Sequence, residues 1–241
     1  MKVLGIETAT LAGGVALIDE TRLIAEYRLH VEVRHSERLL STIDHLMTGS
    51  GISLADLDGI AVSIGPGSFT GLRVCLATAK GLAFGIGKPL ALVPTLEGMA
   101  AAFPYCKAPV SPWLDARRGE VYWGLFDYTG AALARLRPDA ATSPEQVLDE
   151  IKRLGREILF IGEGAIQYRE KIVEALGERA LFPPPASHFP SSAAIAERGL
   201  FRLLKGETVS PEEAAPIYLR ASTAESKWDA ARQTEQKGSA G

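Results

Sequence analysis

The residues with the clearest chemical potential form one short turn, Gly65-Pro66-Gly67-Ser68. The turn lies between a strand-like apolar run, residues 60–64, and a helix-like segment, residues 72–84. Glycine allows positive φ angles and close approach of a ligand, and Ser68 can cap the helix, whose first N–H groups have no internal partner. Such helix starts attract phosphate or carboxylate groups. The same residues also suit a tight corner that binds no ligand.

The spacing of this loop separates it from the common catalytic and nucleotide-binding loops. Its glycines at 65, 67 and 71 are one residue further apart than in the dinucleotide fingerprint, and no Lys-Ser or Lys-Thr pair follows as in a P-loop. Ser68 directly follows Gly67, so the Gly-x-Ser-x-Gly pattern of a nucleophile elbow is absent. The loop therefore predicts an anion site of another kind.

Two further polar groups follow the first strand of the chain. Residues 3–6 lack polar side chains and are followed by Glu7 and Thr8, and a second strand-like run begins near Gly13. A carboxylate at a strand end could hold a hydrated cation, and a threonine hydroxyl can donate to a phosphate. We expect a hairpin here that faces the glycine loop.

The order of the expected elements indicates an α/β protein and resembles the two-lobed actin-like ATPase fold of sugar kinases, actin and heat-shock ATPases, in which mixed sheets are flanked by helices. Residues 1–104 form the expected N-terminal lobe, completed by a helix within 190–220. Residues 105–189 form a smaller C-terminal lobe, and the polar run 221–241 is expected to be a flexible tail.

The actin-like resemblance also gives a role to a second glycine turn, Gly162-Glu163-Gly164. In that fold a glycine pair at this place meets adenosine, but the intervening Glu163 would repel a nucleotide's phosphates if it pointed inward. The full set of candidate anion- or nucleotide-binding residues is Glu7, Thr8, Gly65, Gly67, Ser68, Gly162 and Gly164. ATP or ADP is the candidate ligand, although we expect this chain to require no cofactor.

Five ordered segments resemble one family, TsaB, also called YeaZ: residues 7–9, 35–40, 65–73, 114–122 and 216–220. The resemblance implies a noncatalytic partner and activator of the TsaD enzyme. Together they form threonylcarbamoyladenosine at the adenosine next to the anticodon of tRNAs that read codons starting with A. It further implies a TsaD heterodimer, a larger complex with TsaE, and a homodimer when the chain is alone.

The catalytic paralogue TsaD binds its metal through a His-x-x-x-His pair on a helix, where residues four apart share one face. In this chain Thr95 and Met99 stand at those positions, and neither offers an imidazole nitrogen. The four histidines form no His-x-x-x-His or His-Glu-x-x-His pattern, and surface or capping roles are expected for them. We expect no metal, no catalytic residue and negligible ATP hydrolysis. The alternative is an independent actin-like ATPase or small-molecule phosphotransferase, based on Glu7 and the glycine loops.

A partner surface is expected on two helices. A helix capped by Ser36 and reaching Thr48 has a wide apolar face, and the helix 70–84 is rich in small residues. The TsaB resemblance implies a helical bundle with TsaD at this place. The expected interface residues are Leu39, Leu40, Ile43, Met47 and Arg73. A glutamate at an exposed member of the set Leu39, Ile43 and Met47 should weaken both assemblies.

Composition sets the outer limits. The 241 residues carry a formal net charge of −3, so we expect tRNA contact only through the complex, with Arg34, Arg38, Arg117 and Arg118 as local contributors at most. No signal peptide is visible, and no run was expected to approach the ~18 apolar residues of a membrane span. Two cysteines, Cys75 and Cys106, make no disulfide framework. A cytoplasmic protein without a membrane partner is the expectation.

Overall fold

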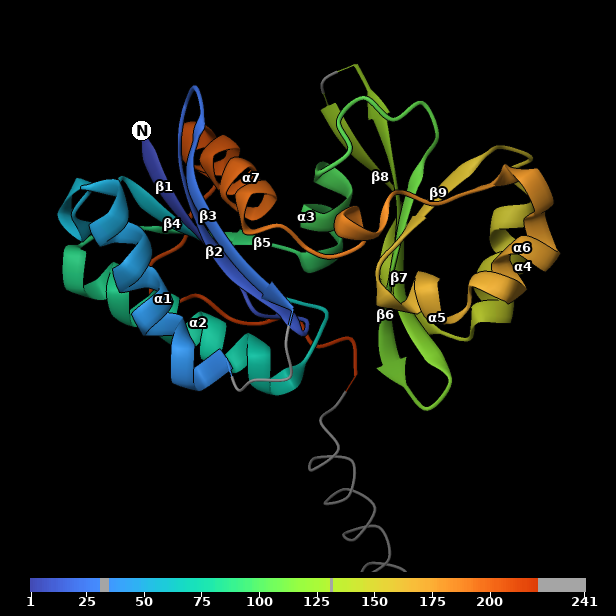
Figure 1. The fold of residues 1–241 in the computed structure, drawn as a ribbon, viewed down its shortest axis with the longest axis horizontal. Helices are drawn as coiled ribbons and strands as arrows, with labels where there is room; N and C mark the ends of the chain where they lie inside the picture. Colours follow the sequence, from blue (N-terminus) through green and yellow to red (C-terminus); the bar gives the residue numbers. More distant parts are fainter. Residues whose placement is uncertain (31–34, 131, 221–241) are drawn as a thin grey trace, which may run out of the picture.

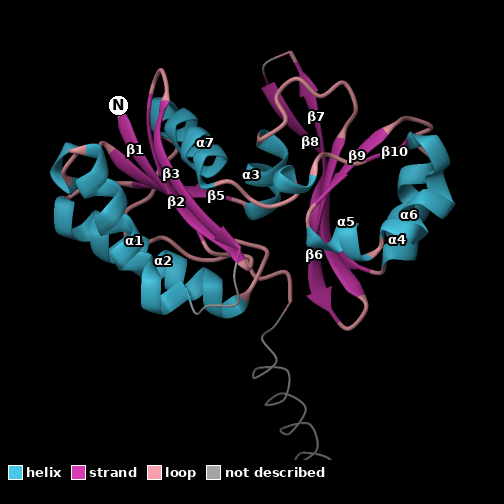
Figure 2. Cartoon of the chain, in the orientation of Figure 1, coloured by secondary structure: helices cyan, strands magenta, loops and turns pink. Residues whose placement is uncertain are grey.

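The computed structural model describes residues 1–30, 35–130 and 132–220, and it divides into two lobes, each built around a five-stranded mixed sheet (Figure 1). The side chains of residues 35–37 also lie outside this description. The expected tail at 221–241, and Arg34, therefore fall outside the described residues. Figure 2 shows helices packed around both sheets, as the α/β prediction requires.

The N-terminal sheet has the order β3-β2-β1-β4-β5. Its strands are β1 Lys2–Glu7, β2 Ala12–Asp19, β3 Leu23–His30, β4 Gly59–Ser63 and β5 Leu90–Val93. The first three strands form an antiparallel meander, and β4 and β5 run parallel to β1.

Helices cover both faces of this sheet (Figure 1). They are α1 His35–Ser50, α2 Phe69–Ile86 and α7 Ser192–Lys205, with a short 3-10 helix at Leu54–Asp56. Alternate residues of β1 serve the two faces: Leu4 joins the core under α1 and α2, whereas Val3 joins the core under α7. The distant helix α7 thus completes the lobe that begins at residue 2.

The C-terminal sheet has the order β10-β9-β6-β7-β8. Its strands are β6 Val110–Arg117, β7 Glu120–Thr129, β8 Ala132–Thr142, β9 Ile158–Ile161 and β10 Ala180–Leu181. Its helices are α4 Pro144–Lys152, α5 Glu163–Gln167 and α6 Arg169–Leu176, with 3-10 helices at Gly177–Arg179 and Pro185–Ser187. Trp113 and Phe160 pack on the α4–α6 side of this sheet.

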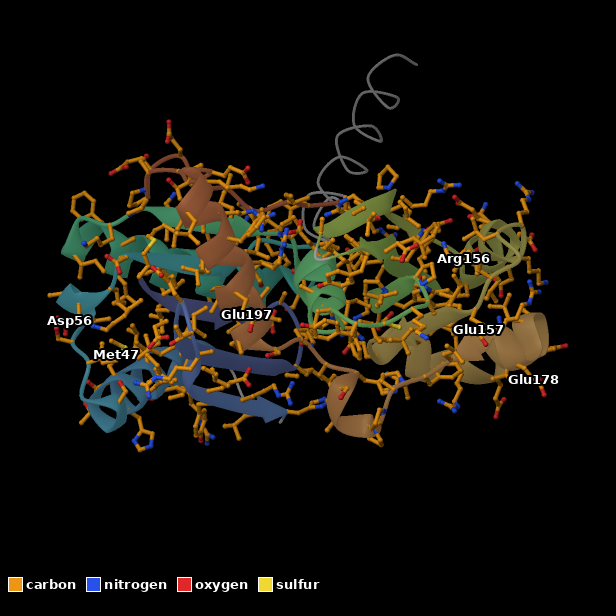
Figure 3. All side chains as sticks on the ribbon, turned by 90° about the horizontal axis from the view of Figure 1, so that it is seen from above. Met47, Asp56, Arg156, Glu157, Glu178 and Glu197 are labelled. Carbon is orange, nitrogen blue, oxygen red and sulfur yellow. The ribbon has the colours of Figure 1, made fainter. Side chains whose placement is uncertain are left out.

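The two lobes meet through α3 Thr95–Ala101, which packs against α7 and against β6 (Figure 1). Glu97 of α3 accepts hydrogen bonds from Arg198 and Arg202 of α7, and Arg135 of β8 lies 3.6 Å from the same carboxylate. In Figure 3, Met47 marks the N-terminal lobe and Glu178 the opposite end of the molecule. The Glu97 carboxylate therefore contacts arginines of both lobes: Arg198 and Arg202 of the N-terminal lobe and Arg135 of the C-terminal lobe.

The helix starts follow the sequence with one exception. Ser68 caps α2 by accepting from the Gly71 N–H, Ser143 caps α4, and Ser191 caps α7. Ser36 was expected to cap the helix of residues 36–48, but that helix begins at His35, so Ser36 lies inside it. A helix capped by Ser36 would begin at residue 37, so the expected start was two residues too late.

The helix α2 corrects the expectation that no segment of the chain approaches the length and apolarity of a membrane span. Its 18 residues have a mean hydropathy of 1.3, which is long and apolar enough to cross a membrane by length and composition, and 33% of them are buried. A single helix of this kind is weak support for a membrane span, because packed helices pass the same test. Here Leu72, Cys75 and Ala79 pack into the core of the N-terminal lobe.

Candidate functional site

The main candidate site is a cleft of about 700 Å³ that residues of both lobes line. Four stretches of chain line most of it: residues 9–11, 66–70, 114–118 and 217–220. The first two belong to the N-terminal lobe, the third to the hairpin between β6 and β7, and the fourth to the segment after α7. Glu163 also lines the cleft. Predicted site residues and unexpected ones therefore meet here.

The glycine loop adopts the predicted backbone, but its own chain fills the space next to it. Gly65 and Gly67 have φ angles of 115° and 159°. A Cβ at Gly65 would lie 2.3 Å from the Ile217 carbonyl oxygen, and one at Gly67 would lie 2.4 Å from that of Ala9. The Ser68 N–H donates to the Ala9 oxygen at 2.7 Å. The close approach that glycine allows is thus used by the protein's backbone rather than left for an anion.

Glu7 and Thr8 lie in the interior and do not line the cleft. The Thr8 hydroxyl donates to the Gly71 carbonyl at 2.8 Å. The Glu7 Oε1 atom accepts from the Ala9 N–H at 2.5 Å, and Oε2 has no hydrogen-bond partner among the described residues. Burial raises the pKa of Glu7 to about 8. A neutral carboxyl is a poor cation ligand, and the Thr8 hydroxyl is used within the fold, so neither side chain is presented to the cleft in this structure.

The second glycine turn closes in the same way. Gly162 has a φ of 99°, and a Cβ there would lie 2.1 Å from the Trp113 carbonyl oxygen. A Cβ at Gly164 would lie 3.2 Å from Trp113. Glu163, between them, lines the cleft, and burial raises its pKa. The two glycines therefore serve the packing of α5 on β6, and the acidic residue between them faces the cleft.

The opposite wall of the cleft is open. It is the hairpin β6–β7, where Arg118 and Gly119 form a two-residue turn with φ angles of 56° and 78°. Arg117 also has a positive φ, 64°, and its N–H donates to Asp115 Oδ1 at 2.8 Å. Both arginines are exposed. The left-handed conformation costs a non-glycine residue about 1 kcal/mol.

The segment after α7 crosses the cleft, which sequence reasoning did not foresee. The Ile217 N–H donates to the Ile64 carbonyl at 2.7 Å. On the other lobe, Arg220 donates to the Ala116 carbonyl at 3.1 Å and pairs with Glu120 at 2.7 Å. Sequence reasoning identified residues 216–220 as a family segment, but a motif gives no sign of where a loop returns in space.

Aromatic rings accompany this segment. The ring of Tyr218 lies 4.9 Å from that of Phe69 between centroids, and the Arg73 guanidinium lies 3.9 Å above the Phe69 ring. Arg73 Nε also donates to the Tyr218 hydroxyl at 3.3 Å. Arg73 was predicted to contact a partner, and the structure shows it engaged by the chain's own C-terminal segment.

Three of the predicted interface residues are buried. Leu39, Ile43 and Met47 are 5%, 3% and 6% exposed and belong to the core beneath α1. Leu40 is 61% exposed. The proposed glutamate substitutions at the three buried positions would disrupt the core of the lobe rather than test an interface. The wide apolar face therefore divides into a buried stripe and one exposed leucine.

Thr95 and Met99 share one face of α3, as the spacing predicts, and both are buried. Thr95 Oγ1 accepts from the Gly65 N–H at 3.1 Å, and the Met99 side chain lies near Gly162. In the described parts of the chain no group of three or more His, Cys, Asp or Glu is placed to hold a metal ion. His188 is buried rather than at the surface, and it is the C-cap residue of the 3-10 helix Pro185–Ser187, as the capping alternative allowed.

Comparison with known proteins decides the family. The family model "TsaD: tRNA N6-adenosine threonylcarbamoyltransferase" matches residues 30–228. The Bacillus subtilis tRNA threonylcarbamoyladenosine biosynthesis protein TsaB is 33% identical and covers 95% of this chain and 98% of its own length. The protein of the same name from Escherichia coli is 32% identical, and the match covers 93% of this chain and 96% of the relative. The chain belongs to the TsaB family.

Solved structures agree with this assignment. A Pseudomonas aeruginosa protein described as similar to peptidase YEAZ has a TM-score of 0.77 and 31% identity, and covers 91% of this chain and 99% of its own. A ROK hexokinase from Thermus thermophilus has a TM-score of 0.50 and 13% identity, and the match covers 84% of this chain and 100% of the hexokinase chain. The hexokinase likeness concerns the fold alone. With the two mixed sheets flanked by helices, it confirms the actin-like architecture in this TsaB family member.

Proposed function

We propose that this chain is a noncatalytic partner of a TsaD-type enzyme in the biosynthesis of threonylcarbamoyladenosine on tRNA. Membership of the TsaB family carries the proposal, since the curated relatives are named for that pathway. The buried Thr95 and Met99, at the positions of the metal-binding histidines, support a role without metal chemistry. The proposed setting is a cytoplasmic complex that also contains TsaE, and tRNA reaches this chain within the complex.

The outer face of α1 and α2 is the proposed docking surface. Besides Leu40, Phe84 of α2 is 72% exposed. Ala77, Gly81 and Gly85 are exposed one turn apart along α2, and nothing lies within 4 Å of a Cβ added at either glycine. A second helix can approach closely over such a row, with large apolar side chains on its flank. The high hydropathy of α2 and its low buried fraction fit a helix whose outer face is covered in an assembly.

The alternative of an independent ATPase or phosphotransferase loses its main support. It rested on Glu7 and the glycine loops, and these residues are buried or closed against neighbouring backbone. Among the described residues, the acidic side chains that line the cleft belong to no group of three or more His, Cys, Asp or Glu that could hold a metal ion. We therefore keep the accessory role as the single proposed function, with self-association through the same α1–α2 face when TsaD is absent.

The function is tested by reconstituting tRNA modification from TsaD, TsaE and the threonylcarbamoyl-adenylate donor, with and without this chain. Modification should require the chain. Equal modification in its absence would overturn the accessory role.

The docking surface is tested with Gly81→Leu. Leucine favours a helix interior by up to about 1 kcal/mol over glycine and meets open space here, so the chain alone should unfold at higher urea. The added side chain should block a close helix pair and lower TsaD binding at least tenfold in size-exclusion and pull-down assays. Ile166→Glu changes an exposed apolar residue on α5 and is the matched control. Retained TsaD binding by the Gly81 variant would place the interface elsewhere.

A further inference from the structure

The cleft has an electropositive rim on one side and an acidic floor on the other. Arg117 and Arg118 stand exposed at the tip of the β6–β7 hairpin. Arg117 is 3.2 Å from Asp115, an exposed pair that water screens. Arg118 makes no ion pair or hydrogen bond with the described residues. Deeper in, Glu163 faces the cleft. An anion is thus favoured at the mouth and disfavoured at the floor.

The backbone of this rim is strained in a way that glycine or asparagine would relieve. Two-residue hairpin turns with both φ angles positive favour Asn-Gly, yet the residue before Gly119 is arginine. Arg117 adds a second positive φ. Sequences that keep strain at an exposed loop tip commonly do so for function. The guanidinium groups, rather than the turn, are therefore what these positions provide.

Aromatic side chains stand at the same mouth. Tyr218 is 40% exposed and lines the cleft together with Phe69 and Tyr122. An exposed ring beside arginines is the combination by which proteins hold single-stranded nucleic acid, with bases stacking on rings and phosphates meeting cations. A volume of about 700 Å³ accommodates a nucleotide unit of such a strand.

We propose that the mouth of this cleft binds single-stranded RNA, with Arg117 and Arg118 contacting phosphates and Tyr218 stacking on a base. This inference rests on the proposed function, because a tRNA-modifying assembly supplies an RNA loop as its substrate. A free nucleoside triphosphate fits less well. Among the described residues, no group of acidic side chains lines the cleft to hold the metal ion that accompanies a triphosphate, and its phosphates would share the cleft with the carboxyl group of Glu163. The net charge of −3 makes the contact weak outside an assembly.

The direct test is fluorescence anisotropy of the full-length chain with a labelled uridine decamer, between about 50 and 200 mM salt. The double variant R117N/R118N keeps residue types that accept positive φ, so the hairpin should stay folded. It should weaken decamer binding at least tenfold. Because each lost phosphate contact lowers the slope of log K against log salt by about 0.7, the slope should fall by about 1.4.

The matched control is K152A/R153A, which removes two exposed charges from α4 and the residue after it, in the same lobe. It should bind the decamer within about twofold of the unchanged chain. ATP should not compete with the decamer. Unchanged affinity and salt slope in R117N/R118N, no decamer binding by the unchanged chain at about 50 mM salt, or displacement of the decamer by ATP would each overturn the RNA proposal.

Reconstituted tRNA modification separates this proposal from the accessory role. R117N/R118N should still bind TsaD but should raise the KM for tRNA. Wild-type modification kinetics for this variant would overturn the RNA contact and leave the accessory role intact. A chain that binds the decamer but adds nothing to modification would overturn the accessory role instead.

Discussion

Both walls of the interlobe cleft contain residues with positive φ angles, but these residues serve different purposes on the two walls. On the N-terminal wall, glycines at 65 and 67 let the backbone of residues 9 and 217 come so close that a Cβ would clash. On the C-terminal wall, Arg117 and Arg118 hold positive φ angles in the open, where nothing presses on the turn. Positive φ at a glycine with a close neighbour is therefore a packing device. Positive φ at an exposed arginine indicates a side chain kept for its chemistry.

The largest effect is expected for Gly71→Ala in α2, directly after the glycine loop of the N-terminal wall. A Cβ at Gly71 would lie 2.0 Å from the Thr8 carbonyl oxygen, so the backbone of β1 or α2 must move. We expect a loss of about 3 kcal/mol or more in the free energy of unfolding, measured by urea denaturation. Gly81→Ala in the same helix meets open space and should raise that free energy by about 0.5–1 kcal/mol. A small loss in the Gly71 variant would mean that the wall is loosely packed.

The buried carboxyl behind that wall gives the next largest effect. The pKa of Glu7 is raised to about 8, so the folded chain holds a proton that the unfolded chain releases near pH 4.5. Stability from this group is complete below pH 4.5 and is lost as the pH rises toward 8. In Glu7→Gln this dependence should vanish. Its stability relative to the unchanged chain should therefore rise by about 3 kcal/mol between pH 5 and pH 8. A constant difference across those pH values would show an ionised, solvated Glu7.

The smallest effect is expected on the open wall. Arg118→Asn places asparagine before Gly119, which two-residue turns with positive φ angles prefer. We expect a gain of a few tenths to about 1 kcal/mol in the free energy of unfolding, measured by thermal and urea denaturation. A loss of stability would mean that the Arg118 side chain supports the fold, and the contrast between the walls would then fail.

Local patterns in the sequence were sufficient to predict helix starts and the backbone conformation of the glycine loop. Ser68 caps its helix as predicted, and the glycine loop has its predicted positive φ angles. The interface prediction failed for a local reason that was available. Leu39, Ile43, Leu46 and Met47 repeat at helical spacing and form the buried stripe, and Leu40 is the residue that does not fit it.

By itself the sequence determined the first strands, the helices that pack on the N-terminal sheet, the glycine turns and the family. These depend on neighbours along the chain, on periods of 2 and 3.6 residues and on backbone sterics. Only the tertiary structure decided what lies against each glycine, because the atoms that meet Gly65, Gly71 and Gly162 come from Ile217, Thr8 and Trp113. Whether a loop is a binding site or a closed contact depends on such distant backbone. For this reason the predicted anion loop proved to be closed, and the open cleft rim formed from the arginine hairpin and the returning C-terminal segment.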